Sequence, residues 1–341
     1  MQDYLMTHDD DPLHTREKSI MKGFLSRDDL PAVRAMVAKI CRSILDSSGN
    51  SIEAVNGYCR ATPARLVQEY FGLDGVDPKS LIEWSYWNQY DVFHNDPFHL
   101  ISDELRREIS TRHAQADQQL ATYLKELITR KLVEVKAEQV GNILLSPVNL
   151  VGKLWQLIRG KKPYQVKDDI VTRMLRTSYP ATVEFDIQRV GVNAGGLLIG
   201  AIETTSQAVA QAIQFLFERP ALLAGAFLFR KTAEDCVVAG GTPHQATIKA
   251  GAIVLALTQS AMVDSAAFER PGEFIGGRNW YRYFHFGFGS HECLGKYVGM
   301  VMIPDIVRQI LLLPGIQAHG SIDFKSGPFP ERYDLPWRTN P

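Results

Sequence analysis

The residues best suited to carry chemistry lie in the segment FGFGSHECLG, from Phe286 to Gly295. Gly287 and Gly289 allow the backbone to turn tightly and to approach a flat group closely, because glycine accepts conformations that other residues resist. The following segment, KYVGMVMIPDIVRQILLL, has apolar residues at helical spacing. This places Cys293 at the mouth of a helix, where backbone N–H groups favour a thiolate over a thiol. Cys293 is therefore the candidate metal ligand.

A second chemically suggestive segment is GAIETT, from Gly200 to Thr205. It lies in a stretch that is predicted to form one long buried helix, roughly from Glu184 to Glu218. The acid Glu203 and the alcohol Thr204 are adjacent, and such a pair can relay protons through water. A mid-helix threonine can also bond back to a carbonyl one turn earlier and distort the helix. Taken alone, the hexapeptide is weak evidence, since threonines and small residues are common in packed helices.

Together the two segments resemble the cytochrome P450 family. The heme-binding signature of that family, Phe-x-x-Gly-x-(Arg or His)-x-Cys-x-Gly, is matched at every fixed position by Phe286, Gly289, His291, Cys293 and Gly295. The resemblance implies that the Cys293 thiolate binds the iron of heme b, iron protoporphyrin IX. It also implies that Thr204 and Glu203 deliver protons during oxygen activation. The alternative role of a small buried hydrophobe suits the other cysteines better, namely Cys41, Cys59 and Cys236.

Further heme contacts follow from the same resemblance. The segment FLFRKTAEDCVVAGGTPHQATIKAGAIVLAL alternates apolar and polar residues around its AGG turn, which predicts strand, turn and strand. In the family this segment follows helix K, and Arg230 matches an arginine that grips a heme propionate bidentately. His291, His14 and Lys18 match the remaining propionate-binding positions. Each of these four side chains could instead be a solvated surface charge. The family's meander is matched by Pro271, Phe274 and Arg278.

Two departures from the family pattern lead to an expectation of an incomplete P450 fold. The Glu-x-x-Arg pair of helix K is not found between Thr204 and Arg230. Arg278 would then be a buried charge without its acidic partner, which costs several kcal/mol. In addition, Met1 opens directly onto a segment that resembles helix C, so the front sheet strands and helices A and B have no counterpart. We therefore expect a mobile cysteine loop and weakly held heme.

Composition indicates a large globular domain. With 341 residues, 45% of them hydrophobic, a single heme-thiolate domain over residues 1–341 is expected, mainly α with a small β portion. Helical periodicity marks residues 30–46, 62–73, 104–134 and 167–179. The aromatic segment from Trp84 to His99 could line a substrate channel or pack between helices.

Charge, cysteine usage and hydropathy argue against some classes of protein. A net charge of -1 argues against a nucleic-acid-binding protein. The four cysteines have no paired spacing, which indicates a reducing compartment and a cytoplasmic location. The first residues are polar and acidic, unlike a signal peptide. No run of about 18 apolar residues occurs, so no membrane span is predicted.

The resemblance implies a soluble, bacterial-type monooxygenase. Such an enzyme inserts one oxygen atom from O2 into an apolar small molecule. Its electrons come from an external ferredoxin or flavoprotein reductase, because the chain carries no dinucleotide-binding fingerprint. Two alternatives stay open, a heme-thiolate peroxygenase or isomerase and a non-catalytic fragment of such an enzyme. The Glu203–Thr204 pair favours oxygen activation over isomerase chemistry, whereas the missing helix K pair favours the fragment.

Overall fold

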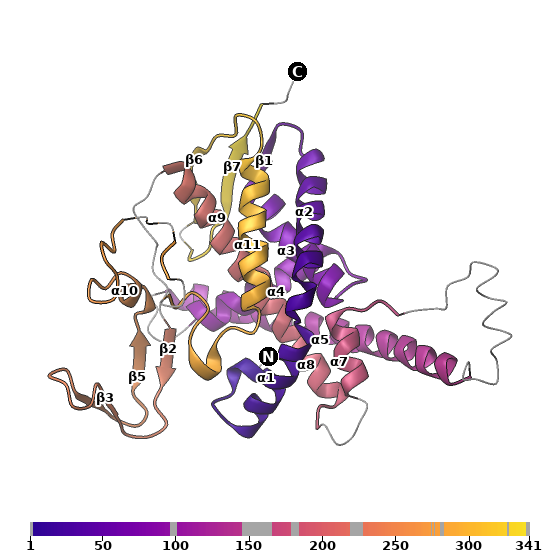
Figure 1. Cartoon of the computed structure of the whole chain (residues 1–341), viewed down its shortest axis with the longest axis horizontal. Helices are drawn as coiled ribbons and strands as arrows, with labels where there is room; N and C mark the ends of the chain where they lie inside the picture. The colour runs from indigo at the N-terminus through magenta and orange to yellow at the C-terminus, as the bar shows by residue number, and fades with distance from the viewer. Residues whose placement is uncertain are drawn as a thin grey trace. The chain divides into compact units, whose positions relative to one another are not determined.

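The computed structural model describes residues 3–95, 101–144, 166–178, 184–218, 228–273, 275, 277–279, 283–325 and 327–338 (Figure 1). The chain divides into two compact units. Unit 1 comprises Met1–Phe217 and Leu294–Pro341, and unit 2 comprises Glu218–Cys293. The sequence predicted one domain over residues 1–341, and that stays a prediction. In the part of the chain that the structure describes, the strands of unit 2 pair only with one another.

Unit 1 is built mainly from helices. Its α-helices are α1 (Pro12–Phe24), α2 (Leu30–Asp46), α3 (Ala61–Leu66), α4 (Pro78–His94), α5 (Asp103–Leu144), α7 (Ile170–Thr177), α8 (Ile187–Ala201), α9 (Glu203–Glu218) and α11 (Lys296–Leu311). Shorter helical turns are η1 (Leu5–Thr7) and η2 (Arg27–Asp29), and η3 (Val55–Arg60) and η4 (Val67–Phe71) are π-helical. The periodic segment 30–46 therefore forms a helix with the predicted bounds.

Aspartate side chains cap the N-termini of four of these helices. Each accepts a hydrogen bond from a backbone N–H in the first turn, which would otherwise lack a partner. Asp11 caps α1 and Asp77 caps α4, whereas Asp169 and Asp186 cap α7 and α8. These caps fix where the helices that carry the candidate residues start.

Helices α2 and α11 pack side by side in the core of unit 1 (Figure 1). Val33 and Val37 of α2 and Val298 and Met302 of α11 are all at most 4% exposed and belong to one apolar cluster. The Tyr58 hydroxyl from η3 donates to the carbonyl of Ile306 at 2.7 Å. The helix that follows the cysteine segment is thus anchored deep in unit 1.

A three-stranded antiparallel sheet brings the first third of the chain to its last residues. The strand order is β1 (Ser51–Glu53), β7 (Arg332–Pro336) and β6 (His319–Asp323). Ile52 lies opposite Leu335 in the register of β1 and β7. Both side chains are buried, at 9% and 0% exposed, so this sheet closes one side of the core of unit 1.

The predicted long helix from Glu184 to Glu218 is two helices. Helix α8 ends at Ala201, α9 begins at Glu203, and Ile202 between them forms a bend. Its φ and ψ of -86° and -66° leave the ideal helical geometry. The prediction of one continuous helix was wrong because apolar periodicity runs through the bend without a change.

Unit 2 contains two small two-stranded sheets and two short helical turns. Strand β2 (Leu228–Lys231) pairs with β5 (Ile253–Ala256), and β3 (Cys236–Val238) pairs with β4 (Ala246–Ile248), all antiparallel. The helical turns are α10 (Thr258–Met262) and η8 (Gly289–His291). The predicted strand, turn and strand pattern around AGG is confirmed, with Ala239 and Gly241 at positive φ in the turn.

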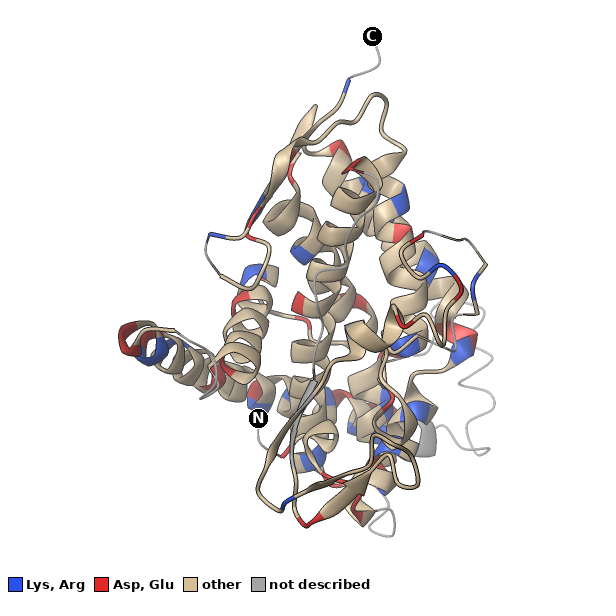
Figure 2. Cartoon of the chain, turned by 90° about the vertical axis from the view of Figure 1, so that its left-hand side faces the viewer, with Lys and Arg blue, Asp and Glu red and all other residues tan. Residues whose placement is uncertain are grey.

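Basic and acidic residues are interspersed through the elements of both units (Figure 2). Among the described residues, no helix is both long enough and apolar enough to cross a membrane.

Candidate active site

Main-chain hydrogen bonds shape the segment that carries Cys293. The Cys293 N–H donates to the carbonyl of Phe286 at 2.7 Å, and the Gly287 N–H donates to the carbonyl of Phe284 at 3.0 Å. Gly287 and Gly289 have φ of 70° and 68°, in the left-handed region that favours glycine. A side chain at Gly287 would also meet the His291 carbonyl at 3.3 Å. The two glycines are therefore required by the turn, as the sequence predicted.

The four cysteines differ in exposure, and exposure decides which can act as a thiolate. All four are thiols rather than disulfides, and Cys293 is exposed. Cys41 and Cys59 are fully buried, and burial raises the pKa of each thiol above its ordinary value. A thiolate is the form that binds metal, so the two buried cysteines are poor ligands. Cys236 is partly exposed on β3.

The bend between α8 and α9 leaves an open surface beside Thr204. The Thr204 hydroxyl donates to the carbonyl of Gly200 at 2.6 Å, as the sequence predicted for a threonine that distorts a helix. Gly200 and Thr204 are both exposed. A side chain added at Gly200 would meet no atom within 4 Å. Space for a small ligand therefore lies next to the hydroxyl.

Glu203 points away from that surface and is fully buried. Its two carboxylate oxygens accept from Arg60 of η3, at 2.8 Å from Nε and 3.0 Å from Nη2. The remaining N–H groups of Arg60 donate to Asn56 Oδ1, Glu331 Oε2 and the Pro330 carbonyl, at 2.7, 3.2 and 3.1 Å. All five donors of the guanidinium are thus used, which fixes the position of the Glu203 carboxylate.

Burial and the neighbouring charges shift the pKa values of Glu203 and Arg60 in opposite directions. Burial raises the pKa of Glu203 above its ordinary value, and the Arg60 guanidinium opposes that shift. Burial would lower the pKa of Arg60, but the bonds to Glu203 and Glu331 raise it overall, so the guanidinium stays charged. Tyr86 of α4 extends the network, since its hydroxyl donates to Glu331 at 2.8 Å. The sequence analysis missed Arg60, although an arginine between buried Cys59 and Thr62 requires an acidic partner.

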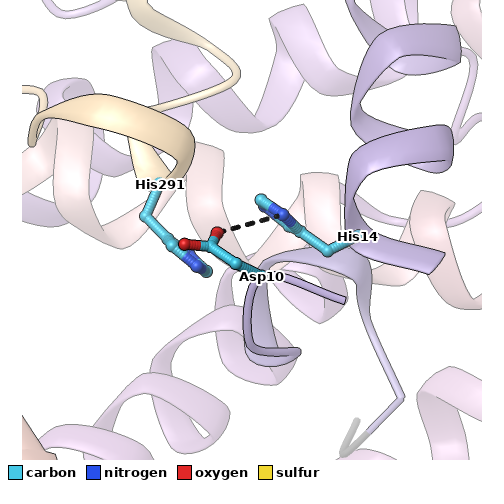
Figure 3. Close-up of side chains that lie close together, drawn as sticks. All are labelled: Asp10, His14 and His291. Carbon is cyan, nitrogen blue, oxygen red and sulfur yellow. Dashed lines mark ion pairs between the residues drawn. The ribbon is translucent and has the colours of Figure 1, made fainter. Parts of the chain in front are cut away.

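His14 and Lys18 lie one turn apart on α1 and are 1% and 5% exposed. The alternative that they are solvated surface charges is therefore wrong. His14 Nδ1 lies 3.7 Å from a carboxylate oxygen of Asp10, an ion pair when the imidazole is protonated (Figure 3). Buried cationic side chains of this kind are suited to bind an anionic group.

The other candidates lie in unit 2. Arg230 lies in β2, opposite Val254 of β5, and its side chain lies outside the described part of the structure. His291 is partly exposed in η8. Pro271 is partly exposed as well, and Phe274 falls outside the described residues.

Arg278 differs from the sequence-based expectation of a buried, unpaired charge. It is partly exposed, and its guanidinium donates to the carbonyls of Glu269, Arg270 and Glu273 at 2.6, 2.8 and 3.1 Å. The expectation was wrong because three main-chain carbonyls take the place of the acidic partner. Arg278 thereby holds the turns at residues 269–273 together.

The aromatic residues of α4 form a cluster with Phe329, which is 2% exposed. Phe329 has edge-on ring contacts with Tyr86, Tyr90 and His94, at centroid distances of 5.4, 5.3 and 5.1 Å. The positions 86, 90 and 94 lie on one stripe of the helix. This part of the aromatic segment from Trp84 to His99 is therefore packed, and residues 96–99 lie outside the described residues.

Comparison with known proteins agrees with this arrangement. The sequence profile of the cytochrome P450 family matches residues 219–313. The chain is 23% identical to mycinamicin IV hydroxylase/epoxidase from Micromonospora griseorubida, over 90% of this chain and 72% of that protein. It is 22% identical to 6-deoxyerythronolide B hydroxylase from Saccharopolyspora erythraea, over 84% of this chain and 65% of that protein. The crystal structure of P450BioI with a ligated acyl carrier protein shares the fold, with a TM-score of 0.72 over 98% of this chain and 81% of that one at 17% identity.

The profile match and the P450-named relatives support membership of the cytochrome P450 family and a P450-type oxidoreductase. Its mainly α fold with a small β portion is confirmed. Family membership implies a heme cofactor. The residues present fit that group, because the exposed Cys293 follows a glycine turn and could supply a thiolate to iron.

Proposed function

We propose that this chain is a monooxygenase that inserts one oxygen atom from O2 into an apolar small molecule. The observation that carries the proposal is the bend at Ile202, where an exposed hydroxyl and an open surface lie beside a buried acid. Heme b would supply the oxygen-activating chemistry when bound, with Cys293 as its ligand. Electrons would come from a separate ferredoxin or flavoprotein reductase. The thiol state of all four cysteines supports a reducing, cytoplasmic setting.

In this proposal the candidate residues divide into three roles. Cys293 holds the iron, and Phe286, Gly289 and Gly295 shape the segment around it. Cationic or protonated side chains bind the heme propionates, since charge-assisted bonds to carboxylates are strong; these are His14, Lys18, Arg230 and His291. Thr204 and Glu203 handle protons.

The geometry at the bend indicates how Thr204 would work. Its O–H is directed at the Gly200 carbonyl, so the lone pairs of the hydroxyl oxygen are available to accept a bond from a water or a ligand on the exposed side. A water held there is a proton source of suitable acidity when it is linked to a carboxyl group. Glu203 is buried and bound to Arg60, so its part in the relay requires its carboxyl to leave Arg60 or to reach Thr204 through water.

The bend at Ile202 and the activities of two relatives support oxygen insertion. Thr204 presents an exposed hydroxyl at that bend. Both relatives named above are hydroxylases, which supports a monooxygenase reaction for this chain. The presence of both Glu203 and Thr204 favours this reaction over an isomerase reaction.

The substitution Thr204→Ala tests the proposed reaction. With a substrate found by screening for a spectral shift, we expect product formed per electron consumed to fall several-fold and released hydrogen peroxide to rise, while heme content stays unchanged. Loss of the hydroxyl removes the acceptor that orders the proton-donating water. Thr205→Ala is the matched control, because Thr205 is the neighbouring alcohol but is only 4% exposed. An unchanged product yield in Thr204→Ala would mean that Thr204 is only a packing residue.

A further inference from the structure

Two polar side chains of α4 hold the carbonyl of one residue near the bend. The Gln89 amide Nε2 donates to the carbonyl of Ile199 at 2.6 Å. The Ser85 hydroxyl donates to the same oxygen at 3.3 Å. Gln89 is 3% exposed and Ser85 is 0% exposed. The two residues are one helical turn apart, so they present both donors on one stripe of α4.

The Ile199 carbonyl belongs to the last turn of α8, which ends at Ala201. The carbonyls of a last helical turn have no N–H partner within their own helix. In an uninterrupted helix the Ile199 carbonyl would accept from the N–H of Glu203, four residues later. Here side chains of α4 donate to the Ile199 carbonyl instead, and the Thr204 hydroxyl donates to the carbonyl of Gly200. Side chains thus satisfy two consecutive carbonyls at the bend.

We propose that Gln89, supported by Ser85, is a positioning residue that keeps the bend at Ile202 open and so sets the place of Thr204. The inference rests on the proposed function, because it concerns the hydroxyl that is assigned to proton delivery there. Gln89 touches neither that hydroxyl nor the open surface at Gly200. It acts by competing with the Glu203 N–H for one acceptor.

The α4 donors and the Glu203 N–H compete for the Ile199 carbonyl because a buried carbonyl without a donor is costly. Leaving a buried polar group unsatisfied is more costly than exchanging one partner for another. If the α4 donors are removed, the nearest replacement for the Ile199 carbonyl is the Glu203 N–H, which restores the regular helical bond. The bend then closes, and the first turn of α9 rotates with Glu203 and Thr204.

Hydrogen exchange of the heme-loaded protein tests this closure. In Ser85→Ala/Gln89→Met, which removes both donors, we expect the amides of residues 203–205 to exchange about five- to tenfold more slowly than in the wild type, because they gain helical partners. Asn88→Leu is the matched control. Asn88 is 1% exposed on the same turn, but its amide donates to Trp84 of its own helix at 3.0 Å. Unchanged or faster exchange in the double variant overturns the proposal, as does an equal slowing in the control.

A second variant keeps the proposal testable if the double variant folds poorly. In Gln89→Glu the protonated carboxyl can donate to the Ile199 carbonyl, whereas the carboxylate cannot. Exchange in residues 203–205, compared with the wild type at each pH, should match the wild type at acidic pH. Once the carboxyl ionises, exchange should become slower than in the wild type. Exchange that is slower than in the wild type to the same extent at every pH overturns the proposal, because the donor would then not matter.

The exchange readout separates this inference from the proposed function. Exchange reports the bend directly and requires no turnover. If the bend closes and the product yield per electron also falls, the positioning role of Gln89 and the proton-delivery role of Thr204 are both supported. If the bend closes and the product yield is unchanged, Gln89 holds the bend but Thr204 does not deliver protons.

Discussion

The two units of the chain hold their candidate functional side chains by different means. In unit 1, Glu203 is held by Arg60 from a distant part of the sequence, and Arg60 in turn donates to Glu331. In unit 2, Cys293 is set by its own neighbours, through a main-chain bond to Phe286 and two glycines at positive φ. One residue is held by long-range side-chain contacts and buried, and the other is held by local backbone geometry and exposed.

This difference predicts how each residue responds to substitution. A buried charged network has little room to adjust, so removing one member leaves charges without partners and lowers stability. A local backbone turn keeps its shape when an exposed side chain changes, so a substitution at Cys293 should remove chemistry and leave folding intact. The predictions below test that contrast, from the largest expected effect to the smallest.

The substitution Cys293→Ala should abolish thiolate ligation. We expect the absorption band near the red edge of the Soret region that marks thiolate-bound iron in the reduced, carbon-monoxide-bound state to disappear completely. The unfolding temperature of the protein should remain close to that of the wild type, because the side chain is exposed.

Three single variants serve as controls for that loss, namely Cys41→Ala, Cys59→Ala and Cys236→Ala. Each should keep the band, because two of these thiols are buried with raised pKa values and the third lies on β3. A band that survives in Cys293→Ala would refute the assignment of the ligand.

The substitution Arg60→Met should destabilise the protein strongly. It leaves the carboxylates of Glu203 and Glu331 near one another without their cation, and breaking a buried ion pair in this way costs about 3–5 kcal/mol. The free energy of unfolding in urea measures the effect. Arg60→Met/Glu203→Gln should recover part of the loss, because it removes one of the unpaired charges.

Arg34→Met is the matched control for Arg60→Met. Arg34 also forms an ion pair, with Asp305 at 3.0 Å, but its side chain is 64% exposed. Exposed pairs contribute at most about 1 kcal/mol. Equal losses of stability in the two variants would show that burial does not distinguish them.

The smallest effect is expected at His8, on the surface of unit 1. Burial is the largest single contribution and lowers the pKa of His8, but the hydrogen bonds and charges of Asp3 and Asp11 together raise it above its ordinary value of 6.5. A raised pKa in the folded state means that the stabilisation is fully present below about pH 6.5 and is lost as the pH rises through the folded value. His8→Ala should therefore lower the unfolding temperature by about 1 °C or less near pH 6 and by nothing above the raised pKa. A loss that grows toward alkaline pH would contradict this sign.

The sequence predicted the local features of the site and missed the long-range ones, for a physical reason. The turn at Gly287 and Gly289 and the bond from Thr204 to Gly200 depend on residues at most a few positions apart, so a short pattern contains them. The pairing of Arg60 with Glu203 joins residues that are far apart in the chain. Nothing local distinguishes Arg60 from other arginines except its apolar neighbours.

The same limit explains the two errors about the fold. The bend at Ile202 is favoured by donors from α4, and the periodicity of residues 184–218 does not contain those donors. Arg278 was expected to require an acidic side chain, but main-chain carbonyls satisfy it. In both cases a backbone carbonyl was the partner, and carbonyls are present at every residue, so composition gives no sign of which one is used.

The antiparallel pairing of β1 with β7 also fixes the order in which a growing chain can complete its fold. Strand β1, Ser51–Glu53, is synthesised long before its partner Arg332–Pro336. Until the residues of β7 leave the ribosome, the edge of β1 and the cation of Arg60 have no cover from the segment that carries Glu331. Contacts between such distant residues form slowly and late, and an uncovered strand edge invites pairing with other chains. The sheet of unit 1 therefore stays incomplete until β7 is made, and a chain that stalls before residue 332 should be retained by chaperones or lost to aggregation.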